Sequence, residues 1–192
     1  MLDNFIYRKN TTDENVMKEI LDKQAYRKKK INFGIEEKDV WLDGGAHIGI
    51  FGLYVAQNKG KKVYCYEPET ENYQILQKNA STINSTYNTQ IECKKIDDIL
   101  STYTDINAIK LDIEGSELEI FDFEHNFANI NKLVFEYSFT KDRNMENFFR
   151  RTDILSKHFH VDIQKSYHNQ KYQGKEGFWG GFIDSIVYCV RK

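Results

Sequence analysis

From residue 39 onward the sequence alternates between short apolar runs and stretches with helical spacing, and this alternation constrains the fold more than any other feature. Five runs are predicted to be strands: 39–43, 62–66, 90–94, 108–113 and 132–137. Strands that alternate with helices form βαβ units and hence a parallel sheet. Two later runs follow, 159–163 and 185–190. The stretch between them contains several glycines and leaves too little sequence for a helical crossover, so we expect these two strands to form an antiparallel pair. The prediction is an α/β fold with seven strands, mostly parallel, and an antiparallel last strand.

The residues before this alternation are predicted to be helical. Thr11 and Glu14 have the spacing of a capping box, and apolar residues then follow along one face of a helix over 11–25. A chain of 192 residues is long enough for one sizeable core. We therefore expect a helical lead-in or cap over 1–38 and one α/β domain over 39–192.

Charge and cysteine usage narrow the classes of partner. The formal net charge is −2 and the lysines are spread along the chain, so no nucleic-acid partner is expected. One basic run, 27–30, fits either a solvated turn after a helix or a docking patch for an acidic partner. No segment resembles a signal peptide or an apolar membrane span, so we expect a cytoplasmic protein without a membrane partner. The cysteines fall in separate predicted strands and are expected to be isolated thiols: Cys65, Cys93 and Cys189.

The strongest local signal is a glycine-bearing turn between the first predicted strand and the next helix, at 40–49. Ligands of open α/β sheets bind beyond the carboxyl ends of the strands, where glycine lets the backbone approach them. The dinucleotide template of three glycines fails at Ala46, and the carboxylate of Asp43 would repel a pyrophosphate. That carboxylate suits the ammonium group of a methionine moiety, so Asp43, Gly45 and Gly49 favour S-adenosylmethionine over NAD. The alternative is a turn that serves only the strand-to-helix geometry.

Acidic residues follow the second and third predicted strands. Glu67, before the chain's one proline, lies about twenty positions after the glycine turn, where a carboxylate holds a ribose diol. It could instead be a surface acid at a strand end. Asp97 lies where an adenine edge could be met, but with Asp98 it also fits the N-terminal cap of a helix.

The fourth predicted strand ends in two carboxylates, Asp112 and Glu114, which share one face if the strand continues. They could act as a general base for a substrate hydroxyl or as ligands of Mg²⁺, although a metal is possible rather than expected. Alternatively, Glu114 and Glu117 only place favourable charge in the first turn of a helix. Further candidates for the base are Glu136, at the end of the fifth strand, and His47, which as part of the glycine turn is also expected to contact the cofactor.

Four segments together resemble the motif series of the FkbM-type methyltransferases: LDGGAHIG, YCYEPE, IDDIL and IKLDIEGSELEIF, within about 39–140. The element KLDIEGSE is the part specific to that family. The resemblance implies a Rossmann-like class I methyltransferase sheet with helices on both faces. It also implies S-adenosylmethionine at the positions of Asp43, Gly45, Gly49 and Glu67, with Asp112 and Glu114 at the reactive end.

The implied reaction is methyl transfer to a hydroxyl of a sugar, glycan or other small-molecule acceptor. The span 80–97 is shorter than is usual in the family, which predicts a more open acceptor site. Residues 167–182, with several aromatics and glycines, fit either a mobile lid or a surface loop. Two other classes compete with the methyltransferase: a nicotinamide-dependent oxidoreductase and a non-catalytic module that binds S-adenosylmethionine.

Overall fold

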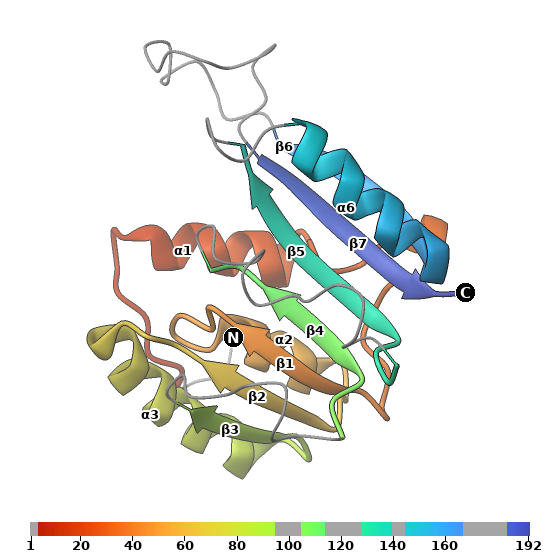
Figure 1. Ribbon diagram of the computed structural model, residues 1–192. Coiled ribbons are helices and arrows are strands. Elements are labelled where there is room, and N and C mark those ends of the chain that lie inside the picture. The colour runs from red at the N-terminus through yellow and green to blue at the C-terminus, as the bar shows by residue number, and fades with distance from the viewer. Residues whose placement is uncertain (1–3, 95–104, 114–127, 140–144, 167–183) are drawn as a thin grey trace, which may run out of the picture.

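The computed structural model describes residues 4–94, 105–113, 128–139, 145–166 and 184–192, and the structural statements below concern these residues. They contain seven strands: β1 Val40–Gly44, β2 Lys62–Tyr66, β3 Gln90–Lys94, β4 Ala108–Leu111, β5 Lys132–Ser138, β6 Phe159–Ser166 and β7 Asp184–Arg191. The strands form one sheet in the order β3-β2-β1-β4-β5-β7-β6 (Figure 1). β1 to β5 are parallel, and β7 runs antiparallel to both of its neighbours. The predicted fold class is thus confirmed.

The strand order creates a switch point in the middle of the sheet. β1 pairs with β2 on one side and with β4 on the other, so the connections after these strands diverge. In open α/β sheets the crevice at such a point, beyond the carboxyl ends of the strands, is where ligands bind. The residues that follow β1, β2 and β4 are therefore brought to one place.

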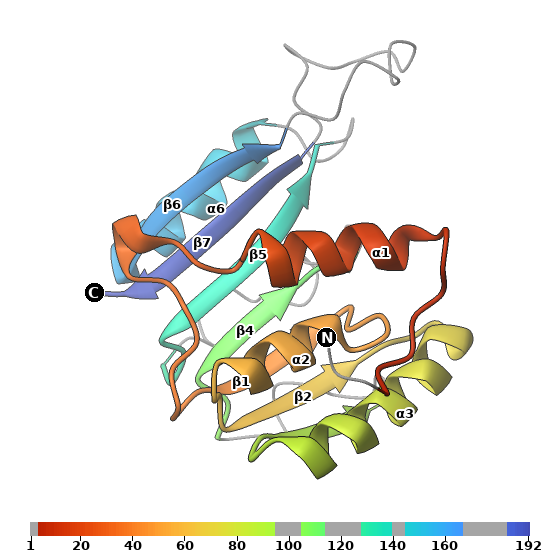
Figure 2. The ribbon, with the colours of Figure 1, turned by 180° about the vertical axis from the view of Figure 1, so that it is seen from behind.

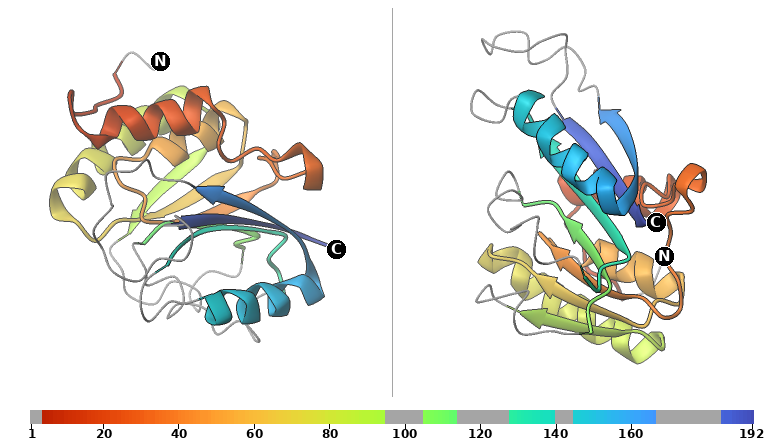
Figure 3. Two further views of the ribbon diagram at one scale, coloured as in Figure 1. Left: turned by 90° about the horizontal axis from the view of Figure 1, so that it is seen from above. Right: turned by 45° about the vertical axis from the view of Figure 1, so that its right-hand side comes forward.

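Helices cover both faces of the sheet. Three of them, with a short π-helical extension, lie on one face and α6 lies on the other (Figure 3). Their bounds are α1 Thr12–Met17, the π-helix Lys18–Asp22, α2 Ile50–Gln57, α3 Thr70–Thr86 and α6 Met145–His158, and a 3-10 turn spans Lys29–Ile31. Helix α6, with Phe148, Thr152 and Leu155 on its buried side, was not anticipated from the sequence.

The N-terminal helix is shorter than predicted. Thr11 caps it, but its hydroxyl accepts from the amide of Asp13 rather than taking part in a capping box with Glu14. The second half winds as a π-helix and ends before residue 25, because Gln24 has a left-handed φ of 51°, which cannot continue a helix.

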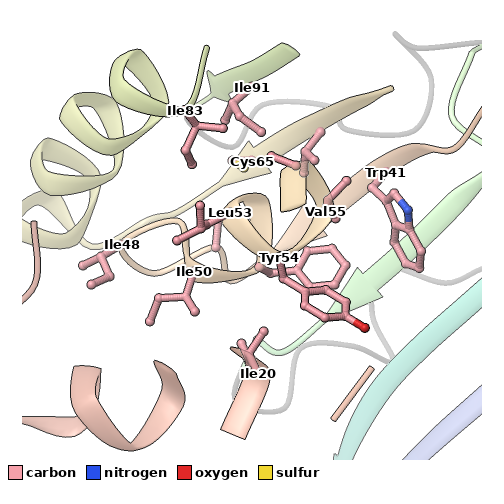
Figure 4. Close-up of a cluster of buried hydrophobic side chains, with 14 of the residues drawn as sticks. Ile20, Trp41, Ile48, Ile50, Leu53, Tyr54, Val55, Cys65, Ile83 and Ile91 are labelled. Atoms are coloured by element: carbon pink, nitrogen blue, oxygen red, sulfur yellow. The ribbon is translucent and has the colours of Figure 1, made fainter. Parts of the chain in front are cut away.

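The core on the α2 side is built around that helix. Every residue of α2 from Ile50 to Ala56 is buried, which fits a helix that is apolar on all sides (Figure 4). Trp41 of β1 meets Phe51 edge to face, with 5.1 Å between ring centroids. This packing fixes α2, and with it the turn that leads into α2, against the carboxyl end of β1.

The basic run at 27–30 packs against the sheet edge. Lys30 Nζ lies 2.7 Å from Asp162 Oδ1, and Lys28 Nζ donates to Gln164 Oε1. Asp162 and Gln164 are both residues of β6. Lysines over an edge strand hinder its pairing with another chain.

The predicted free thiols are observed, with Cys65 and Cys189 buried and Cys93 half-buried. Within the described ranges, no helix combines the length and apolar character needed to cross a bilayer.

Candidate active site

The turn between β1 and α2 is tightly fitted to its surroundings. Gly45 and Gly49 have φ values of 73° and 91°, in the left-handed region. The amides of Gly45 and Ala46 both donate to the carbonyl of Tyr66 at the end of β2, at 3.0 and 2.9 Å. A Cβ on Gly45 would lie 1.8 Å from the carbonyl oxygen of Asp112. Only glycine fits at this position, where the turn lies between the chain ends of β2 and β4.

Beneath the turn lies a buried ion pair between neighbouring strands. Lys110 Nζ is 3.0 Å from Asp43 Oδ1, and the two side chains are 4% and 0% exposed. The same ammonium donates to the carbonyl of Gly45 at 2.9 Å. Burial raises the pKa of Asp43 against the opposing charge of Lys110. Burial would lower the pKa of Lys110, but the Asp43 carboxylate raises it above its ordinary value, so the lysine is protonated.

The pair leaves hydrogen-bonding capacity unused. Neither carboxylate oxygen of Asp43 accepts a well-directed hydrogen bond from the described residues. A buried carboxylate in this state is costly unless its charge is neutralised or a further donor reaches it. Lys110 neutralises the charge and ties it to the backbone of the glycine turn.

Glu67 is bonded directly to the glycine turn. Its Oε2 accepts from the amide of His47 at 2.7 Å, and its Oε1 accepts from the amide of Glu69 at 3.0 Å. The residue is only 5% exposed. A carboxylate has about four acceptor positions, so about two remain for a ligand. The acid after β2 is thus held beside the turn with capacity to spare.

The imidazole of His47 contacts the N-terminal segment. Its Nε2 lies 3.1 Å from Arg8 Nη2 and 3.2 Å from Asp13 Oδ1. Burial lowers the pKa of His47, and the nearby Asp13 carboxylate only partly opposes this. The neutral ring therefore accepts from Arg8, which can only donate.

This environment predicts how stability depends on pH. Because the pKa of His47 is below its ordinary value of 6.5 in the folded chain, acidification protonates the unfolded chain first. The free energy of unfolding should therefore fall as the pH decreases from 6.5 toward the folded-state pKa. His47→Asn, which tolerates the left-handed backbone, should reduce this slope in urea titrations at several pH values. His160→Asn on the exposed edge strand should retain it, and equal slopes in all three proteins would contradict the assignment.

Asp112 and Glu136 meet at a small cavity at the carboxyl ends of β4 and β5. It has a volume of about 20 Å³, room for about one water molecule. Tyr26, from the N-terminal segment, also lines it. The Asp112 side chain is 44% exposed, and its Oδ2 lies 3.9 Å from Lys110 Nζ. Two predicted acidic residues are therefore brought together beside the buried pair.

The central part of the chain matches a known protein family. Residues 80–160 match the methyltransferase FkbM domain. This stretch belongs to the FkbM family. It contains β3, β4 and β5 with Asp112 and Glu136, whereas the glycine turn and Glu67 precede it. The predicted resemblance is thus confirmed over this stretch.

Solved structures that share the fold include several methyltransferases. The precorrin-6y C5,15-methyltransferase of Geobacter metallireducens GS-15 is 12% identical with a TM-score of 0.59, covering 99% of this chain and 95% of its own. TYW2 of M. jannaschii, in complex with AdoMet, is 17% identical with a TM-score of 0.59, covering 98% and 80%. A dimethyladenosine transferase of Plasmodium falciparum is 18% identical with a TM-score of 0.62, covering 90% and 61%. No curated protein sequence matches the chain. At these identities the likeness is one of fold.

Several residues predicted to belong to the site lie outside the described residues. These are Asp97, Glu114, Glu117 and the aromatic segment 167–182. Their assigned roles stay predictions.

The structure also brings to the site four residues to which the sequence analysis assigned no role. They are Lys110, Tyr26, Arg8 and Asp13. Lys110 had a signal in the sequence, because a charged residue inside an apolar strand needs a buried partner. The other three lie in the N-terminal lead-in, and no FkbM motif marks them.

Proposed function

We propose that this FkbM-family chain is an S-adenosylmethionine-dependent O-methyltransferase that acts on a hydroxyl of a sugar, glycan or other small molecule. The observation that carries the proposal is the hydrogen bond between Glu67, at the end of β2, and the glycine turn after β1. It joins a carboxylate suited to a ribose diol to a turn whose backbone is open to close approach. The AdoMet complex of the M. jannaschii structure, which has the same fold, supports this choice of cofactor.

The residues present fit S-adenosylmethionine. Glu67 would hold the ribose with the acceptor positions that its two amide bonds leave free. Gly45 and Gly49 would let the backbone approach the methionine part, and Asp43 has buried oxygens without directed donors. Since Lys110 already neutralises Asp43, we propose that this pair acts mainly by fixing the turn; a direct contact of Asp43 with the ammonium group stays a prediction. When bound, the cofactor supplies a methyl carbon activated by a sulfonium.

Catalysis in such a site would come mostly from positioning the acceptor oxygen in line with the methyl carbon. Asp112 and Glu136 line one cavity beside the turn, so either carboxylate is placed to accept the proton of an acceptor hydroxyl. Asp112 is the more exposed and would meet an incoming acceptor. We propose these two residues, together with the predicted Glu114, as the acid–base groups of the reaction.

The net charge of −2 supports a small-molecule or glycan acceptor over a nucleic acid. An acceptor screen with methyl-labelled S-adenosylmethionine should therefore begin with sugars and glycans. Transfer to RNA alone would correct the acceptor class. Cofactor binding without transfer to any acceptor would favour the non-catalytic module, and binding of NADH in place of S-adenosylhomocysteine would favour an oxidoreductase.

Calorimetric titration with S-adenosylhomocysteine tests the cofactor site. Glu67→Gln should weaken binding about 10- to 100-fold, because a hydrogen bond to a charged group contributes about 1.5–3 kcal/mol and a tenfold change corresponds to about 1.4 kcal/mol. Glu92→Gln is the matched control, since Glu92 is a half-buried carboxylate on β3 paired with Lys62 at 2.6 Å. No binding by the wild type would contradict the proposed function, and equal binding by Glu67→Gln would remove Glu67 from the site.

A further inference from the structure

The N-terminal segment is fastened to the glycine turn by a buried asparagine. Asn79 of α3 is fully buried. Its Oδ1 accepts from the amide of Ile6 at 2.7 Å, and its Nδ2 donates to the carbonyls of Ile6 and Ile48 at 2.9 and 2.8 Å. One side chain therefore joins the N-terminal segment, α3 and the turn.

A second group of contacts, centred on Arg8, lies two turns away along α3. Arg8 Nη2 is 2.9 Å from Asp13 Oδ1, 3.1 Å from His47 Nε2 and 2.7 Å from Asn72 Oδ1. Asp13 is fully buried and also accepts from the amide and Nε of Arg8, at 2.8 and 3.0 Å. Burial alone would raise the pKa of Asp13, but the hydrogen bonds from Arg8 outweigh it and hold the pKa below its ordinary value. Asp13 is thus an ionised anchor within a closed polar cluster.

The contacts of Asn79 and of Arg8 reach adjacent residues of the turn, Ile48 and His47. Asn72 and Asn79 are seven positions apart and so lie on one face of α3, along which the N-terminal segment runs (Figure 2). They secure residues 47 and 48, and the amide of His47 is the one that donates to Glu67. His47 has a φ of 52°, a conformation that costs a non-glycine residue about 1–2 kcal/mol and needs surrounding contacts to hold it.

We propose that residues 5–13 form a clamp and that Arg8 and Asp13 are positioning residues for the cofactor site. They act through His47, whose backbone they hold in the conformation that presents its amide to Glu67. The clamp belongs to the lead-in 1–38, which we propose as a unit added to the domain 39–192. The inference rests on the proposed function, because the clamp is expected to change the affinity for a ligand that Glu67 binds.

The test compares Arg8→Gln and Asp13→Asn with the wild type in the full chain, below the unfolding temperature of each protein. Both variants should bind S-adenosylhomocysteine about tenfold more weakly, which corresponds to about 1.4 kcal/mol. Lys30→Gln is the control, because it removes an ion pair from the same N-terminal region to β6 without touching the clamp. It should bind like the wild type.

A spectroscopic readout separates positioning from a general loss of stability. Asp13 raises and Arg8 lowers the pKa of the His47 imidazole, so NMR titration should show a lower value in Asp13→Asn and a higher one in Arg8→Gln. The two variants thus have opposite effects on the ring but the same effect on ligand affinity. Folded variants that shift the ring as expected and still bind S-adenosylhomocysteine like the wild type would overturn the clamp.

Failure of the proposed function would look different. A wild type that does not bind S-adenosylhomocysteine would contradict the proposed methyltransferase. The clamp would then be tested by the NMR signal of the His47 amide. The proton chemical shift of that amide reports its hydrogen bond to Glu67. Movement of this signal in both variants, but not in Lys30→Gln, supports the clamp, and an unchanged signal overturns it.

Discussion

Gly45→Ala is expected to lower the free energy of unfolding by about 2–5 kcal/mol and to abolish measurable binding of S-adenosylhomocysteine. The left-handed backbone alone costs an alanine about 1–2 kcal/mol, and overpacking of a tight site typically adds about 1–3 kcal/mol. The added Cβ would lie 1.8 Å from the carbonyl oxygen of Asp112, so no side-chain rotation can relieve the overlap. The turn and the segment after β4 must move apart, which separates the two parts of the proposed site.

Gly34→Ala is the matched control for this substitution. A Cβ at Gly34 meets no atom within 4 Å, and its φ lies outside the left-handed region. Urea denaturation should therefore place this variant close to the wild type. If Gly45→Ala were as stable as Gly34→Ala and bound S-adenosylhomocysteine normally, the close fit of the turn against Asp112 would be wrong.

Lys110→Met is expected to destabilise the chain by about 3–5 kcal/mol at neutral pH. Removal of one partner from a buried pair leaves the other charge uncompensated, and here that charge is the fully buried Asp43. Without the lysine the pKa of Asp43 rises further above its ordinary value, so the folded chain binds a proton more readily than the unfolded chain. The deficit relative to the wild type should thus be largest at neutral pH and shrink as the pH is lowered.

Two further variants isolate the cause. Asp43→Asn combined with Lys110→Met removes both charges and should recover part of the lost stability, as measured by urea denaturation. Lys132→Met breaks an equally buried pair, Lys132 with Asp39 at 2.7 Å, at the other end of the sheet. It should cost stability without altering affinity for S-adenosylhomocysteine. A Lys110→Met variant as stable as the wild type at neutral pH would refute the pairing.

The fold followed from sequence pattern because its determinants are local. Apolar runs bounded by turns placed all seven strands to within a few residues, since each strand buries its own side chains. The order of the strands depends on pairing between distant segments, for which periodicity carries no information, so no strand order was predicted. Helix α6 was missed although Phe148, Thr152 and Leu155 have helical spacing, because charged residues between them lower its apolar character.

The site was predictable where one short segment carries several of its residues. Asp43, Gly45 and Gly49 could be identified together because they share one turn, and Glu67 because it follows the next strand. The clamp could not be found in this way, because Arg8 and His47 are 39 positions apart and their types are common on surfaces. Only the folded chain shows that they meet.

The insertion of β7 between β5 and β6 has a consequence for the order of folding. β7 is the last of the seven strands in the sequence, yet it provides the only strand partner that β6 has in the described sheet. During synthesis β6 is therefore made before its strand partner in the described sheet, and the edge of β5 that pairs with β7 stays open until β7 follows. Tyr188 of β7 then closes a contact with the carbonyl of Ala25, at 2.9 Å and 163 positions away. Such non-local closure slows folding, so the half of the sheet that carries Glu136 should be completed last.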